Sequence, residues 1–132
     1  NAPQPRRVTN GVDSSRVAML LAVLERRARI PLSSADVYVS TVGGIRVTEP
    51  GADLAIALAL ASAARDIALP ATLVATGEIS LAGDIRAVTA HQLRAAEATR
   101  LGYSTVLDHT AKTLGEAVRQ ASATADPAKP GF

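Results

Sequence analysis

Side chains that could act as nucleophiles or bases are few and scattered along this 132-residue chain. A hydroxyl becomes a useful nucleophile only when a general base lies next to it. No such base pattern accompanies the serines of the first 40 residues, which are Ser14, Ser15, Ser33, Ser34 and Ser40. His91 and His109 are single imidazoles, and we interpret them as surface or helix-capping residues. The residues therefore form no recognisable catalytic constellation.

The sequence also offers little for a metal or a phosphate group. It contains no Cys, and its two His are far apart in sequence, so they make a poor metal set. The segment GEISLAG, residues 77–83, is not a phosphate loop because no Gly-Lys-Ser/Thr follows it. We expect no cofactor and no metal in this domain.

Arginine dominates the positive charge, with twelve of the 14 cations, although the net charge is only +2. Arginine is preferred where planar, bidentate contacts to phosphate or carboxylate are made. Alanine-rich and arginine-rich usage also follows from a GC-rich genome, so composition alone leaves both explanations open.

The length and composition predict one globular domain with a core built mostly from Ala, Val, Leu and Ile. Charged residues interrupt every apolar stretch before it reaches membrane-spanning length. The first residues, NAPQPRRVTNG, lack the apolar centre of an export signal, so we expect a cytoplasmic location and no membrane partner.

The first half of the chain alternates between extended and helical patterns. We predict a linker remnant at 1–5, an extended piece at 8–12 and a helix that ends near Arg29. Asp13, Ser14 and Ser15 are the N-cap candidates, and the helical spacing is carried by Val17, Leu20, Leu21 and Leu24. Residues 36–42 alternate as a strand, Gly43 and Gly44 break it, and 45–50 resume extended structure.

The second half predicts a buried helix at 52–64, because that segment is apolar at every angle. A buried strand at 73–75 follows, then a hairpin of 78–81 and 84–88 turning at Ala82-Gly83. We predict a helix at 90–101 closed by Gly102, a strand at 104–107 and a helix at 113–120. The domain would then cover 6–121, with a flexible tail at 122–132 and a mixed α/β (α+β) order of elements.

Two stretches resemble the proteolytic domain of Lon-family proteases: VGGIRVTEPGADLAIALALASA (42–63) and ATGEISLAGDIRAVTAHQLRAAEATRLGY (75–103). That resemblance implies a single domain with the ribosomal protein S5 domain 2-like fold. It places Asp53 where the family has its serine nucleophile and Arg94 where it has its lysine base. Arginine cannot act as the base because it does not give up its proton. The resemblance therefore implies a domain that is not a peptidase.

In the family the serine and lysine lie close together, so we expect Asp53 and Arg94 to form a charge-assisted pair that locks two helices. In the alternative interpretation, Asp53 merely caps its helix and Arg94 points to solvent. A serine-lysine peptidase with a shifted site is disfavoured, because Lys112 and Lys129 lie outside the matched stretches.

Among Lon-like domains, the chain is similar to the non-proteolytic C-terminal domain of bacterial RecA-like repair ATPases. The similarity rests on PRRVTNGVDSSRVAMLLAVLERRARIPL, DVYVSTVGGIRVTEPGADLAIALALASA and GEISLAGDIRAV followed by QLRAAEATRLGY. It implies recombinational repair and branch migration by a homo-hexamer. It also implies an N-terminal ATPase domain and a zinc finger elsewhere in the protein, which would bind ATP, Mg and Zn. The expected role of this domain is a hexamer scaffold and a DNA-contacting surface.

The arginines that we expect to contact DNA are Arg7, Arg16, Arg46 and Arg86. Alternation along an extended segment turns Arg46 and Arg86 away from their apolar neighbours, and phosphate contacts need exposed cations of this kind. Arg26, Arg27 and Arg29 are a second candidate set, although a helix C-terminus favours cations in any case. The competing hypothesis is an interaction module that holds the hexamer together without touching DNA.

Overall fold

The computed structural model describes residues 4–125. Residues 1–3 of the predicted linker remnant and 126–132 of the predicted tail lie outside the described part. The helices and strands are β1 (Arg7–Asn10), α1 (Ser14–Arg27), β2 (Val37–Ser40), α2 (Asp53–Arg65), β3 (Leu73–Ala75), β4 (Glu78–Ile79), β5 (Ile85–Arg86), α3 (His91–Arg100), β6 (Thr105–Leu107) and α4 (Leu114–Thr124). This mixed order confirms the predicted α/β class.

Helix α1 begins where its sequence predicts. Asp13 is the N-cap residue, and its side chain accepts a hydrogen bond from the backbone N–H of Ser15 at 3.1 Å. The residues at helical spacing, Val17, Leu20 and Leu24, are buried. The helix ends at Arg27, two residues earlier than expected, because Ala28 forms the C-cap and Arg29 turns to a φ of 58°.

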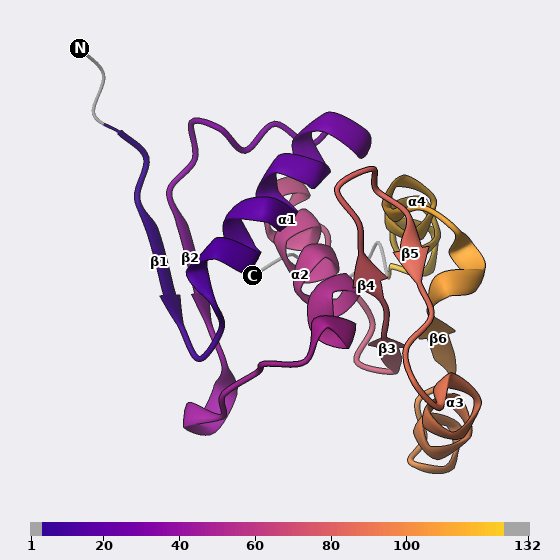
Figure 1. The fold of residues 1–132 in the computed structure, drawn as a ribbon. Helices are drawn as coiled ribbons and strands as arrows, with labels where there is room; N and C mark the ends of the chain where they lie inside the picture. The colour runs from indigo at the N-terminus through magenta and orange to yellow at the C-terminus, as the bar shows by residue number, and fades with distance from the viewer. Residues whose placement is uncertain (1–3, 126–132) are drawn as a thin grey trace.

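The core lies where α1, α2 and α4 meet. Helix α2 contacts both of the other helices, and its small alanines let them approach closely. In Figure 1, α1 and α2 lie between the β1–β2 pair on one side and the β4–β5 hairpin on the other, with α4 behind that hairpin. Helix α2 was predicted to be buried because its segment is apolar at every angle. Most of the helix is buried by this central place, but Ala55, Ala59 and Ala63 form an exposed face.

The strands form three small sheets of two strands each within the described part of the chain. β1 pairs with β2 in parallel, and the chain returns between them through α1. β3 pairs with β6 in parallel, and the connection contains the hairpin and α3. β4 and β5 form the predicted antiparallel hairpin, in which Glu78 faces Arg86 and Ile79 faces Ile85.

Most element ends differ from the sequence prediction by one or two residues, and three differences are more informative. The strand at 36–42 is shorter, since Val42–Gly44 forms a 3₁₀ turn that projects beyond β2. β3 is only partly buried, because it lies at the edge of a two-stranded sheet. α4 continues to Thr124, so the first three residues of the predicted tail are helical; Ala121 is buried in the core and anchors this last turn.

Candidate functional site

Asp53 is the most buried charged residue in the described part of the chain, with 1% of its surface exposed. It is the first residue of α2, after a short turn at Pro50–Ala52. The positive end of the helix dipole favours a carboxylate there. Its Oδ2 accepts a hydrogen bond from the backbone N–H of Ile79 at 3.0 Å, which ties α2 to β4.

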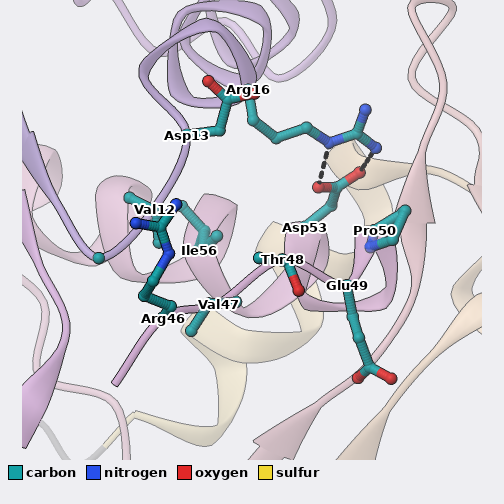
Figure 2. Close-up of a pocket in the computed structure, with 11 residues that line it drawn as sticks. Val12, Asp13, Arg16, Arg46, Val47, Thr48, Glu49, Pro50, Asp53 and Ile56 are labelled. Atoms are coloured by element: carbon teal, nitrogen blue, oxygen red, sulfur yellow. Dashed lines mark hydrogen bonds and ion pairs between the residues drawn. The ribbon is translucent and has the colours of Figure 1, made fainter. Parts of the chain in front are cut away.

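The partner of Asp53 is Arg16 on the first turn of α1. Arg16 Nε donates to Asp53 Oδ1 at 2.7 Å, and Arg16 Nη2 donates to Asp53 Oδ2, so the pair is bidentate (Figure 2). Glu78 Oε1 lies 3.7 Å from the same Nη2. The hydrogen bond to Asp53 raises the pKa of Arg16 further above its ordinary value, against the opposite effect of burial. One ion pair therefore joins α1, α2 and β4.

The predicted pairing of Asp53 with Arg94 is wrong. Arg94 donates from Nε to the carbonyl oxygen of Thr89 at 3.0 Å, and its Nη2 lies 3.5 Å from Glu49 Oε1. Both Arg94 and Glu49 are exposed. The buried carboxylate of Asp53 already has two guanidinium donors and one amide donor, so Arg94 is left to the more accessible acid.

A cavity of about 530 Å³ opens beside this ion pair. Figure 2 shows Arg16 and Asp13 on one side of it and the segment Arg46–Pro50 on the other. Its lining holds two cations, Arg16 and Arg46, and the carboxylates of Asp13, Glu49 and Asp53. Thr48 is the hydroxyl residue of this lining, which contains no Ser, Lys, His or Cys among the described residues.

The four predicted DNA-contacting arginines fall into different surroundings. Arg16 is neutralised by Asp53. Arg7 is held against the 32–35 loop, where it donates to the carbonyl oxygens of Ala35 and Leu32, the latter at 3.0 Å. Arg46 and Arg86 are exposed, and their side chains make no hydrogen bond or ion pair with other residues of the described range.

Three of the four arginines are nevertheless grouped. Arg16 and Arg46 line the same cavity. Arg86 lies directly across the hairpin from Glu78, which contacts Arg16. Cross-strand neighbours have their Cβ atoms about 5 Å apart, so Arg86 stands next to this group. Arg7 is at the far end of β1 and does not join it.

The second candidate set, at the C-terminal end of α1, is also exposed. Arg26, Arg27 and Arg29 make no ion pair within the described part. The aliphatic stem of Arg27 packs against Gly83 in the hairpin turn. A Cβ added to Gly83 would lie only 3.0 Å from Cγ of Arg27. This set lies at the opposite end of α1 from Arg16 (Figure 1).

One contact was missed by sequence reasoning: the rings of His91 and His109 lie 4.6 Å apart between centroids, at 79° to each other. Both residues are partly buried, and Nδ1 of His109 is buried without a hydrogen-bond partner. The carboxyl of neighbouring Asp108 is partly buried, which raises its pKa, but hydrogen bonds from Thr110 and the nearby imidazoles outweigh this and lower it. The sequence gave no signal for the contact between His91 and His109, because the two residues are far apart in sequence. Within 4–125, no group of three or more His, Cys, Asp or Glu could hold a metal ion.

Comparison with known proteins identifies relatives for most of the chain. No family model matches it. It is 55% identical over 106 residues to a protein named DNA repair protein RadA from Mycolicibacterium smegmatis, covering 80% of this chain and 23% of that protein. The RadA proteins of Mycobacterium tuberculosis and Escherichia coli are 52% and 48% identical over 103 and 99 residues. Those matches cover 78% and 75% of this chain, and 22% of each relative.

This chain is homologous to part of RadA. It spans less than a quarter of the length of the curated relatives it matches. Among the helices of the described range, none combines the length and apolar character needed to cross a membrane.

Proposed function

We propose that this chain is the non-proteolytic Lon-like domain of a RadA-type DNA repair protein and supplies a DNA-contacting surface. The observation that carries the proposal is the homology to RadA proteins over about four-fifths of the chain. The proposed setting is recombinational repair and branch migration in the cytoplasm. There the domain acts within a homo-hexamer that also contains a RecA-like ATPase domain.

The electrostatics of the site support a revised set of contacts. Phosphate binding needs cations whose charge is not already neutralised. The charge of Arg16 is neutralised by Asp53, and the guanidinium of Arg7 is bound to backbone carbonyls, so we assign the direct contacts to Arg46 and Arg86. Arg16 is a positioning residue that fixes α1 and the hairpin, so that Arg46 and Arg86 flank one surface.

We expect no peptide hydrolysis by this domain, and the same geometry supports that expectation. In the cavity beside Asp53, the position of the nucleophile is held by a carboxylate that is bound on both oxygens. A carboxylate so engaged is a structural anchor and is poorly placed to attack. An active-site serine probe should leave the chain unlabelled.

Fluorescence anisotropy on duplex DNA tests the assignment. The double variant Arg46→Gln/Arg86→Gln should bind more weakly, and the slope of log affinity against log salt should become shallower by about 1.8, since each lost phosphate contact removes about 0.9. Arg100→Gln is the matched control, because Arg100 is an exposed arginine on α3 that pairs with Glu97. Equal affinity and slope for the double variant and the control would contradict the proposal.

A second function is favoured by a separate observation on α3. Leu93 and Leu101 are 74% and 60% exposed, and they line an apolar groove of about 380 Å³ with Val74, Ala98 and Tyr103. An exposed apolar surface of this kind marks an interaction site. The alternative to DNA contact is therefore a domain that only holds copies of the protein together.

A further inference from the structure

The 3₁₀ turn after β2 forms a protruding tip, Val42–Arg46, whose aliphatic residues Val42 and Ile45 do not line the cavity beside Asp53, although Arg46 does. Val42 is 89% exposed and Ile45 is 64% exposed. The tip stands away from the helices at the lower end of β2 in Figure 1. Gly43 and Gly44 both have a φ of 72°, and nothing lies within 4 Å of the place where a Cβ would be on either. Two aliphatic side chains are thus presented to solvent on a narrow turn.

The base of the tip is held on both sides. The hydroxyl of Thr41 donates to the carbonyl oxygen of Ile45, which closes the turn. The N–H of Thr41 donates to Asn10 at 3.0 Å, and the N–H of Val47 donates to Gly11 at 2.7 Å. The two arms are therefore fixed to the end of β1 and to Gly11, the residue that follows it. A braced turn can press its side chains into a partner without first losing much conformational entropy.

The charge of the tip itself favours nucleic acid as that partner. Residues 37–48 contain no Asp or Glu, and Arg46 is their one cation. Arg46 directly follows Ile45, is exposed and makes no ion pair with a residue in the described range. Apolar side chains inserted between bases next to an arginine are a known way in which proteins kink or unstack DNA.

We propose that the tip Val42–Arg46 is a wedge that enters DNA where duplex meets single strand. Val42 and Ile45 would insert against the last base pair, and the guanidinium of Arg46 would hold the neighbouring phosphate. A junction is the expected substrate because a pair at the end of a duplex unstacks at lower cost than one inside it. This inference rests on the proposed function, since it requires DNA binding. It is tested separately, at Val42 and Ile45 rather than at the two arginines.

The test uses a forked DNA with 2-aminopurine at the junction and a blunt duplex of the same sequence. The wild-type chain should bind both and raise 2-aminopurine fluorescence on the fork. Val42→Ser/Ile45→Ser should abolish that rise and lower the preference for fork over duplex by about tenfold. Its affinity for the blunt duplex should stay at the wild-type level, because both arginines remain. Both side chains are exposed, so circular dichroism should show an unchanged fold.

Leu81→Ser provides the matched control, since Leu81 is a 76% exposed aliphatic residue in the hairpin turn, away from the tip. It should behave as wild type. If the tip variant keeps the fluorescence rise, the wedge is wrong while the proposed function stands. If the wild type binds neither DNA, both fail. A third outcome is that the tip variant has a different sedimentation coefficient without DNA, and that its loss of fork preference is explained by this change of assembly. In that case the tip is a protein contact and the wedge is overturned.

Discussion

At the scale of single residues, the Arg16–Asp53 pair explains how a carboxylate is accommodated in the core. Asp53 is almost fully buried, but the side chain of Arg16 is 33% exposed. Removing Asp53 and removing Arg16 should therefore have different consequences for the residue that remains. Arg16 can turn to water, whereas Asp53 would keep only the N–H of Ile79.

This asymmetry predicts an order of destabilisation. Arg16→Met keeps the apolar stem but strands a buried carboxylate, which should lower the free energy of unfolding by about 3–5 kcal/mol. Asp53→Ala should cost less, about 1–3 kcal/mol, because the freed guanidinium can be solvated. Arg94→Ala should cost no more than about 1 kcal/mol, since its ion pair with Glu49 is exposed. Urea unfolding at neutral pH measures all three, and a loss for Arg94→Ala as large as that for Arg16→Met would refute this order.

The same pair shows where sequence reasoning stops. The resemblance to Lon proteases correctly singled out Asp53 as a special position, and the Lon-like spacing placed Arg94 nearby on α3. It could not tell which guanidinium would reach the carboxylate, because that depends on how α1 crosses α2. Arg16 was instead expected to contact DNA. It lies on α1 as predicted, but the packing of α1 on α2 directs its guanidinium toward Asp53.

At the scale of elements, local sequence patterns predicted which helices exist. Pairing between distant segments determined how the strands are arranged and how long they are. The apolar spacing of α1, the apolar run of α2 and Gly102 after α3 were each sufficient to predict a helix. The parallel pairing of β1 with β2 and of β3 with β6 joins segments far apart in sequence, and no local signal encodes it. These pairings also cut the strands shorter than their β-branched runs, because only the paired residues are held extended.

Gly11 is where two of these elements meet. It follows β1 with a φ of 87°, and a Cβ at this position would overlap the Thr41 hydroxyl and lie 2.7 Å from the carbonyl oxygen of Ile45. Gly11→Ala should therefore lose about 2 kcal/mol or more of stability through backbone strain and overlap combined. Gly43→Ala carries a similar positive φ but meets no atom within 4 Å, so it should lose only about 1 kcal/mol.

Thermal unfolding of the two glycine variants separates the cost of backbone strain from the cost of steric overlap. A larger loss for Gly11→Ala would show that the base of the tip is rigidly packed on β1, as the wedge requires. Equal losses would mean that the tip yields to the added methyl group and is not braced.

At the scale of the whole molecule, the two proposed activities use different residues. The cations assigned to DNA lie near the start of α1 and on the hairpin, while the apolar groove lies on α3 next to β6. The ion pair between Glu49, which lines the cavity, and Arg94, which lines the groove, connects the two sites. α3 contributes only Ala98 to the buried residues, so most of its surface is available to a partner. Leu93 and Leu101 are eight residues apart and therefore lie on the same side of the helix. DNA contact and self-association can thus coexist, and they can be removed one at a time.

This separation gives the last prediction. If a second copy of the chain covers the α3 groove, Leu93→Ser/Leu101→Ser should shift sedimentation equilibrium toward the monomer, because it removes the apolar surface that association would bury. Duplex affinity per subunit should remain unchanged, since the variant retains both Arg46 and Arg86. The complementary variant, Arg46→Gln/Arg86→Gln, should keep the wild-type assembly and lose DNA. An apolar groove variant that assembles like wild type would remove the support for a pure scaffold, because the groove is the observation on which that alternative depends.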